Sequence, residues 1–179
     1  KVEPPFGKRL WQSQDPAIDF LWIDALGLWV SKFEITNEQY RRYKEAHWSG
    51  MFQGERLAGN PQPVVNVSHH DAVEFSLWLT RNDRDAERIP QSGWRYRLPT
   101  EKEWMTVAQC GKDRLYPWGK GWPPKLGNYA DKTLANRPWA TQYIENYNDS
   151  HRVTCAVYES GKNEWGFYGV GGNVWEWMY

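Results

Sequence analysis

The 179-residue sequence predicts one loop-rich α+β domain with short strands, two to three short helices and a long irregular second half. Three observations support this prediction. Short segments of alternating apolar and polar residues are typical of strands. Three segments with polar caps are typical of short helices. The second half is rich in glycine, proline, asparagine, aspartate and aromatic residues, which indicates irregular structure.

The first half carries the clearest strand signals. Residues 20–23 are apolar, and residues 28–35 alternate from Val30 onward, with Gly27 at the turn between the two segments. Residues 1–19 are polar with little periodicity, so we expect an irregular lead-in there and the domain itself over residues 20–179. Weaker signals predict strands or extended segments at 63–67, 94–98, 153–157 and 166–168.

Each predicted helix begins at a capping signal. Thr36 and Gln39 form a capping box, Ser68 is followed by Asp71 in the first turn, and Thr100 opens a second capping box. The side-chain oxygen of such a cap accepts a hydrogen bond from a backbone N–H that the helix leaves without a partner. The predicted helices cover approximately residues 37–47, 69–83 and 101–110.

Residues 112–165 show few regular signals, and a stretch of coil this long is unusual in a compact domain. Metal ions or side-chain hydrogen bonds are the usual means of ordering such a segment. Asp131, Asn146, Asn148 and Asp149 offer the hard oxygen ligands that calcium prefers. Acidic residues in loops are equally often solvated, so composition alone leaves both interpretations open.

The charge balance excludes some classes of partner. Lysine plus arginine and aspartate plus glutamate each number 22, and no long segment carries one sign of charge. We therefore expect no electrostatic capture of nucleic acid or of an anionic membrane. The longest apolar segment, residues 20–30, is interrupted by Asp24 and is too short to span a bilayer.

Two further features of composition leave alternatives open. The 13 tryptophans are typical of a core pinned by aromatic packing, although some could form a stacking surface for a sugar. Cys110 and Cys155 match no zinc motif, and they could form one disulfide or remain two buried thiols.

Several segments, taken in their order and spacing over residues 28–177, resemble the formylglycine-generating-enzyme and sulfatase-modifying-factor family. This resemblance implies an α+β fold, a variant of the C-type lectin fold with a small twisted antiparallel sheet, two to three helices and much ordered coil. The segments are Phe33 to Tyr40 (FEITNEQY), Pro63 to Ser68 (PVVNVS), Tyr96 to Trp104 (YRLPTEKEW), Tyr116 to Gly119 (YPWG), Gly127 to Asp131 (GNYAD), Asn163 to Tyr168 (NEWGFY) and Gly171 to Trp177 (GGNVWEW).

The resemblance also implies calcium as a cofactor. A first site falls on the carboxylates of Asp131 and Asp149, completed by backbone oxygens of Lys132 and His151. A second site falls on the glycine-rich turn and comprises backbone oxygens of Gly172 and Val174 and the carboxylate of Glu176. The family usually has Asn or Asp where this chain has Gly169, so this second set lacks one side-chain ligand.

Enzymes of this family use copper and oxygen to oxidise a cysteine of a target sulfatase to formylglycine. Their paired active-site cysteines follow the tryptophan motif, whereas this sequence ends at Tyr179, directly after that motif. Cys110 and Cys155 do not align with the pair. We therefore predict no catalytic residue in these 179 residues, and we expect copper only if a cysteine pair lies in a C-terminal segment outside them.

Three functions remain open. The sequence favours a non-catalytic domain that binds a protein or glycan ligand or serves as a scaffold. It could instead be the N-terminal portion of a copper-dependent formylglycine-generating oxidase, or, less favoured, a carbohydrate-binding module. A partner chain or a further C-terminal segment is expected to complete the sheet. Some relatives are displayed at bacterial or phage surfaces, and with the possible disulfide this suggests an extracytoplasmic location.

Overall fold

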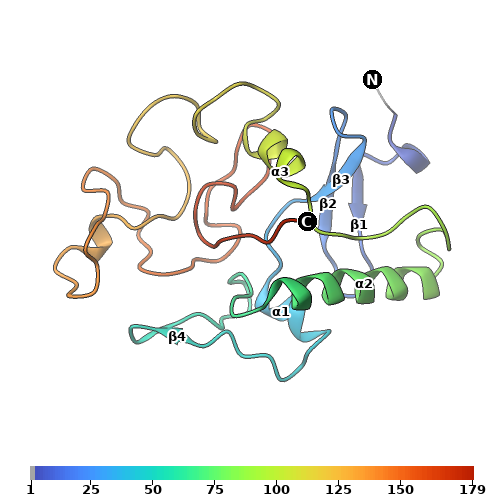
Figure 1. The fold of residues 1–179 in the computed structure, drawn as a ribbon, viewed down its shortest axis with the longest axis horizontal. Coiled ribbons are helices and arrows are strands. Elements are labelled where there is room, and N and C mark those ends of the chain that lie inside the picture. Colours follow the sequence, from blue (N-terminus) through green and yellow to red (C-terminus); the bar gives the residue numbers. More distant parts are fainter. Residues whose placement is uncertain (1–2) are drawn as a thin grey trace.

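A three-stranded antiparallel sheet forms one end of the molecule in the computed structural model, which describes residues 3–179. The strand order is β1-β2-β3, and Phe20 at the centre pairs with Trp11 on one side and Ser31 on the other (Figure 1). β3 is therefore an edge strand of this sheet. The strands are β1 (Leu10–Gln12), β2 (Asp19–Ile23) and β3 (Leu28–Ser31).

The turn between β2 and β3 forms at Gly27, as predicted. Its φ of 64° lies in the left-handed region, which glycine adopts without a steric penalty. The backbone N–H groups of Leu26 and Gly27 both donate to the carbonyl of Ile23, which closes the turn. β3 ends at Ser31, so it is shorter than the predicted segment 28–35.

Three helices begin at the predicted caps, and each has a complete capping box. The first is shorter than expected because the chain beyond Arg42 continues as separate turns, with Lys44 N bonded to Tyr40 O and His47 N to Lys44 O. The helices are α1 (Asn37–Arg41), α2 (His69–Asp85) and α3 (Glu101–Ala108), with short 3-10 turns η1 (Pro5–Gly7) and η2 (Lys132–Leu134).

The core consists of two clusters of buried apolar side chains. One joins the sheet to α1 and α2, and the other joins β2 to α3 and the last part of the chain. Figure 1 shows α2 running across one end of the strands, and the helix buries Phe75 and Leu79. The first cluster contains Ile18, Phe20, Tyr40, Phe75 and Leu79, and the second contains Ile23, Val107, Ala108, Phe167 and Val170.

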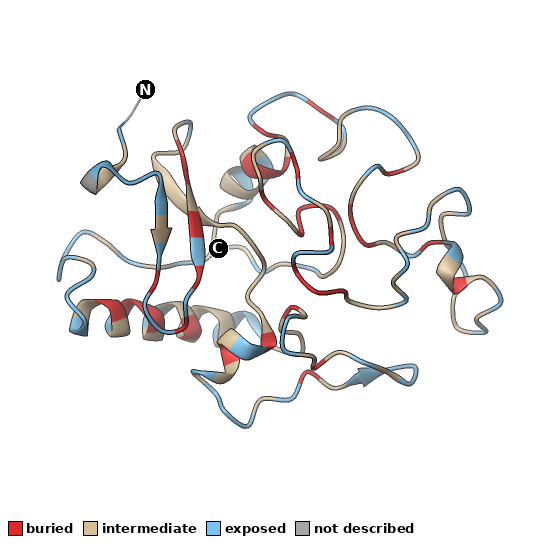
Figure 2. Cartoon of the chain, turned by 180° about the vertical axis from the view of Figure 1, so that it is seen from behind, coloured by how far each residue is buried: buried red, intermediate tan, exposed pale blue. Residues whose placement is uncertain are grey.

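The second half is ordered coil in which side chains satisfy the backbone. Asn163 is a clear example: its amide nitrogen donates to Val107 O at 2.8 Å, and its oxygen accepts from the backbone N–H groups of Trp165 and Phe167 at 3.0 and 3.1 Å. Figure 2 shows buried stretches within this irregular backbone. Side-chain hydrogen bonds therefore tie the coil down, which was one of the two means expected.

Several predicted elements are wrong in detail. The segment expected to be an irregular lead-in contains β1, which pairs with β2. Residues 94–98 and 153–157 form no strand, and residues 166–168 make only the single bridge between Lys162 and Tyr168. At Tyr96 the backbone N–H donates to the Thr80 hydroxyl instead of to a neighbouring strand. A short hairpin, β4 (Met51–Phe52) with β5 (Glu55–Arg56), lies in a segment predicted as loop.

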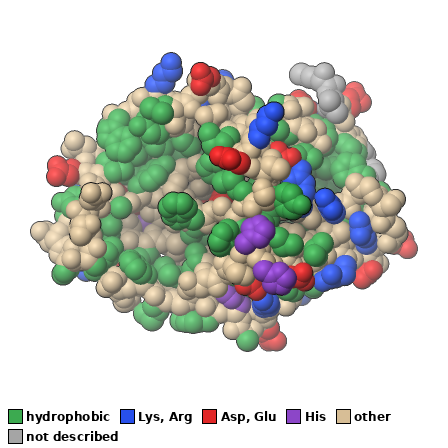
Figure 3. All heavy atoms as spheres, in the orientation of Figure 1, with side chains coloured by type: hydrophobic (Ala, Val, Ile, Leu, Met, Phe, Trp, Pro, Cys, Tyr) green, Lys and Arg blue, Asp and Glu red, His purple; other side chains and the backbone are tan. Residues whose placement is uncertain are grey.

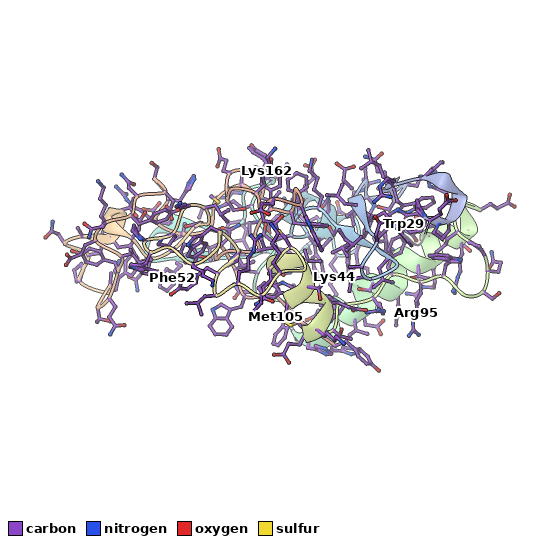
Figure 4. All side chains as sticks on the ribbon, turned by 90° about the horizontal axis from the view of Figure 1, so that it is seen from above. Trp29, Lys44, Phe52, Arg95, Met105 and Lys162 are labelled. Carbon is purple, nitrogen blue, oxygen red and sulfur yellow. The ribbon has the colours of Figure 1, made fainter. Side chains whose placement is uncertain are left out.

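The molecule is flattened when seen from above (Figure 4), with Trp29 in the sheet and Phe52 on the hairpin toward opposite ends. Met105 and Lys162 lie on opposite faces in the same view. Figure 3 shows hydrophobic side chains gathered over the part of the surface formed by the long coil. Within residues 3–179, no helix is long and apolar enough to cross a membrane.

Candidate metal centre

Asp131 is the centre of the hydrogen-bond network in the coil. It precedes η2 as its N-cap and its side chain is fully buried. One carboxylate oxygen accepts from the Thr133 backbone N–H at 2.7 Å and from the Thr133 hydroxyl at 2.6 Å. The other accepts from the Asp149 backbone N–H at 2.6 Å. Two segments far apart in the sequence are thereby held together.

Asp149 repeats this arrangement on the opposite side of the network. Its carboxylate accepts from the backbone N–H groups of Tyr129 at 2.7 Å and His151 at 2.8 Å. The Thr133 hydroxyl also donates to the carbonyl of His151 at 2.8 Å. The structure therefore brings together the predicted first set, Asp131, Lys132, Asp149 and His151.

The electrostatics of this set leave a role for a cation. Burial raises the pKa of Asp149, and the neighbouring charge of Asp131 raises it further. Among the described residues, neither carboxylate takes part in an ion pair with lysine or arginine. Each ionised carboxylate can accept about four hydrogen bonds or ligand contacts, so acceptor capacity remains on both. The donor set is therefore compatible with a hard cation such as calcium.

Side chains alone would not complete such a site. Nowhere in residues 3–179 do three or more His, Cys, Asp or Glu side chains come together as a metal-binding group. Calcium prefers six to eight oxygens, many of them backbone carbonyls or waters. Backbone oxygens, as predicted for Lys132 and His151, would be needed in addition to the two carboxylates.

The second predicted set lies in the turn before the C-terminus. The backbone N–H of Val174 donates to Gly172 O at 2.9 Å, and the Glu176 carboxylate accepts a hydrogen bond from the indole N–H of Trp104. Between them, the Asn173 amide oxygen accepts from Asn128 and from the backbone N–H of Cys155, both at 2.9 Å. This network fixes the turn against α3 and against the coil at Asn128 and Cys155.

Glu34 belongs to this second set, and sequence reasoning missed it. Its carboxylate accepts from the Asn173 amide at 2.9 Å, while its Oε2 is buried without a hydrogen-bond partner among the described residues. A Cβ added at Gly169 would lie 2.5 Å from each Glu34 carboxylate oxygen. Glu34 thus fills the space above Gly169, the position at which the family usually has a side-chain ligand. The glycine was the one signal that could have pointed to a substitute.

The carboxylates of Glu34 and Glu176 both line one cavity and lie near enough for the charge of Glu176 to act on Glu34. Burial raises the pKa of Glu34 to about 7, and the charge of Glu176 adds to the effect. Burial likewise raises the pKa of Glu176 to about 7, opposed by the hydrogen bond from Trp104. Charge on these two groups therefore has no compensating cation within the described chain.

The cysteines do not form a centre of their own. Cys110 and Cys155 are both buried and both free, so the alternative of two buried thiols holds and the disulfide does not. Burial raises the pKa of the Cys155 thiol to about 12. A thiol with such a pKa is a poor nucleophile and a poor metal ligand near neutral pH.

A model of the sulfatase-modifying factor enzyme 1-like domain matches residues 12–179. Among curated relatives, the formylglycine-generating enzyme of Thermomonospora curvata is 32% identical over 126 residues, which cover 69% of this chain and 35% of the relative. The inactive C-alpha-formylglycine-generating enzyme 2 of Bos taurus is 31% identical over 116 residues, covering 64% of this chain and 32% of the relative. The chain thus spans about a third of the length of these relatives.

Solved structures agree on the fold. Variable protein 1 of Treponema denticola superposes with a TM-score of 0.56 over 96% of this chain and 68% of its own, at 20% identity. That identity supports a common fold and nothing finer. The observed small antiparallel sheets, three helices and ordered coil match the predicted class. The chain belongs to the family of the sulfatase-modifying factor enzyme 1-like domain and has its C-type-lectin-like fold.

Proposed function

We propose that residues 1–179 act as a non-catalytic domain that binds a ligand or partner. The observation that carries this proposal is a cavity of about 920 Å³ with a predominantly apolar lining. Its walls come from the sheet, α2, α3 and the last residues of the chain, and several are aromatic. Cavities of several hundred Å³ with few polar groups are typical of binding sites.

The chemistry of the cysteines supports a binding role over catalysis. Copper(I) is a soft ion that thiolates hold well. Cys110 and Cys155 are 2% and 3% exposed and are not bonded to each other. Within residues 3–179, therefore, no pair of accessible thiols offers a copper site of the kind used by the oxidases of the family.

A direct assay separates the proposal from its main alternative. The 179-residue chain would be incubated with copper(I), oxygen and a cysteine peptide derived from a sulfatase, and the products analysed by mass spectrometry. We expect no formylglycine and no stoichiometric copper binding. Conversion of the peptide cysteine by this chain would contradict the proposal and favour the oxidase.

The alternative remains that these residues are the N-terminal portion of a longer copper-dependent oxidase. Similarity to a relative named as a formylglycine-generating enzyme favours it, and the coverage of only 35% of that relative leaves room for a catalytic segment elsewhere. The gene-encoded sequence after Tyr179 and the intact mass of the native protein would decide this point, because a downstream cysteine pair is required.

Calcium at Asp131 and Asp149 is a second proposal for the same domain. Two neighbouring carboxylates that form no ion pair with a described lysine or arginine support it, since a divalent cation would offset their repulsion. We expect excess calcium to raise the melting temperature and a chelator to lower it, because a ligand of the native state stabilises that state. Asp149→Asn should abolish the response, whereas Asp113→Asn on the exposed coil should not. An unchanged melting temperature in all conditions would refute the site.

Carbohydrate binding has one observation in its favour. The rings of Tyr116 and Trp118 stack at 4.8 Å, and the neighbouring Trp122 is 60% exposed. Flat exposed rings on a fixed loop suit stacking against a sugar face. Binding on a glycan array that Trp122→Ala abolishes would support this lesser candidate, and silence across the array would count against it.

A further inference from the structure

The coil after α3 carries an aromatic cluster outside the apolar cavity. Tyr116 and Trp118 stack with ring centroids 4.8 Å apart and an interplanar angle of 5°, and the ring of Trp122 lies 5.7 Å from that of Tyr116. Trp122 is 60% exposed. Figure 1 shows this part of the coil, drawn in yellow, on the far side of α3 from the sheet. Among the described residues, none from 114 to 126 lines the cavity, so the cluster is a separate surface.

Hydrogen bonds fix the loop that presents these rings. The backbone N–H of Tyr116 donates to Gly119 O at 3.0 Å, and the backbone N–H of Gly119 donates to Tyr116 O at 2.9 Å. The indole N–H of Trp118 donates to Gly121 O at 2.7 Å. The same indole packs edge-on against the ring of Tyr129, with centroids 5.8 Å apart. Because the rings are held in place before binding, a ligand that stacks on them loses little free energy to ordering the loop.

The same segment carries an unbalanced positive charge. Residues 114–126 contain three basic residues and no aspartate or glutamate. Arg114 forms an ion pair with Glu164, which lies outside the segment. Lys120 and Lys125 are exposed, and neither forms an ion pair with a described residue. Two ammonium groups, one on each side of the exposed tryptophan in the sequence, can therefore bind an anion.

An acidic sugar suits this combination better than other ligands. A pyranose ring presents C–H groups to the face of an indole, and its carboxylate or sulfate group supplies the negative charge that complements the lysines. A cationic ligand would be repelled by the same two lysines. Nucleic acid binds through contacts to many phosphates, whereas this segment offers two uncompensated charges in a chain of zero net charge.

We propose that Trp122, beside the stacked pair of Tyr116 and Trp118, binds a ring of an acidic polysaccharide, and that Lys120 and Lys125 contact its carboxylate or sulfate groups. The proposal rests on the carbohydrate role given above as the lesser candidate, and it specifies the class of sugar and the residues that select it. The aromatic rings provide affinity for sugars in general, whereas the lysines provide the preference for charge. The two contributions can therefore be tested separately.

Two matched pairs of tetrasaccharides test the preference for charge. One pair is tetragalacturonate and its neutral methyl ester, and the other is chondroitin 4-sulfate tetrasaccharide and its unsulfated form. Binding to the 179-residue chain would be measured by calorimetry at low salt with a chelator present. We expect the charged or sulfated member of at least one pair to bind about fivefold more tightly, because two exposed ion pairs each contribute modestly. The pair that shows the preference identifies the anion, and added salt should remove the difference.

Protein variants separate the rings from the lysines. Lys120→Gln combined with Lys125→Gln should remove the preference for charge. The control, Lys8→Gln combined with Arg81→Gln, removes two exposed charges before β1 and on α2 and should retain the preference.

Loss of the exposed ring should weaken binding of every probe. Trp122→Ala should lower the affinity about tenfold, and Trp122→Phe, which keeps a flat ring, should restore most of it. Trp48→Ala, which removes a tryptophan that is 54% exposed, is the matched control and should leave binding unchanged. The melting temperature of each variant checks that it is folded.

Three results would contradict the proposal. Equal binding within both pairs would overturn the acidic-sugar site while leaving a carbohydrate role intact. Silence of all four probes would overturn the carbohydrate role as well, without affecting the binding role proposed for the cavity. A single-stranded thymidine oligonucleotide that binds more tightly than every saccharide, and loses this affinity in the double lysine variant, would show that the segment binds nucleic acid instead.

Discussion

Residues 10–110 and residues 111–179 reach the same degree of order by different means. The first region buries its backbone polar groups in a sheet and three capped helices, and aromatic packing around Phe75 and Tyr40 fills the space between them. The second region has one short 3-10 turn and relies on side chains such as Asp131 and Asn163 that bond to backbone groups. The comparison teaches that every buried backbone N–H and C=O group needs a hydrogen-bond partner. The regular bonding of sheets and helices is only one way to provide it.

Mutations that remove packed side chains should destabilise the first region most. Phe75 is 5% exposed and contacts the rings of Tyr40 and Trp78, so Phe75→Ala should cost about 3–5 kcal/mol of unfolding free energy. Leu77 on the same helix is 40% exposed, and Leu77→Ala is the matched control with a small expected effect. Denaturant titration measures both, and equal costs would show that α2 does not hold the core.

Loss of a single hydrogen-bond acceptor should destabilise the second region. In Asp131→Asn the side chain keeps its shape but loses its charge and one acceptor oxygen, so buried N–H groups of Thr133 and Asp149 lose part of their bonding. We expect a cost of about 2–3 kcal/mol. Hydrogen exchange should show faster opening of residues 129–151 than of α2. Opening of both regions together would mean that the chain is a single cooperative unit.

The carboxylate pair at the junction of the two regions should make stability depend on pH. Burial raises the pKa of Glu34 from 4.5 to about 7, so the folded state holds this proton more tightly than the unfolded state. The resulting stability is complete below pH 4.5 and is lost as the pH rises through 7. Glu34→Gln should therefore raise the unfolding free energy at pH 8 by on the order of 2 kcal/mol.

That measurement requires a chelator, since a bound metal cation would compensate the charge. Glu45→Gln, at an exposed position after α1, serves as the control and should leave the pH profile unchanged. A profile of Glu34→Gln that parallels the parent chain from pH 5 to 8 would show that the carboxylate is solvated.

The smallest expected effect concerns the caps that distinguish the first region. The Thr100 hydroxyl accepts from the Glu103 backbone N–H at 3.3 Å, and the Glu103 carboxylate accepts from the Thr100 N–H at 2.8 Å. Thr100→Ala should cost about 1 kcal/mol. Thr106→Ala, which removes a threonine within the same helix but no cap, should cost less. A larger effect at Thr106 would contradict the importance of the cap.

Local signals were reliable where they concerned short-range bonds. The three helix caps and the turn at Gly27 were all predicted, because each depends on residues within a few positions of one another. Two of the caps were predicted as capping boxes, and the structure shows a third capping box at Ser68. The strand predicted at 94–98 failed because its alternation reflects packing against α2, with Tyr96 donating to Thr80 and Asp83.

The candidate sites divide in the same way. The family motifs in the sequence placed Asp131 with Asp149 and Glu176 near the glycine-rich turn, and the structure brings each of these groups together. Glu34 stood in an ordinary strand pattern, 142 positions before Glu176, and nothing local indicated that its carboxylate would lie over Gly169. Its pKa and its missing partner arise only from burial against the distant turn.

The sequence by itself determined the class of fold, the positions of the helix caps and the family to which the chain belongs, because these depend on nearby residues and on the order of motifs. Only the tertiary structure decided that both cysteines stay free, that β1 joins the sheet, and that two carboxylates meet at an apolar cavity beside an edge strand. Each of these outcomes depends on groups that are distant in the sequence and come together in the folded protein. Their burial therefore cannot be deduced from neighbouring residues alone.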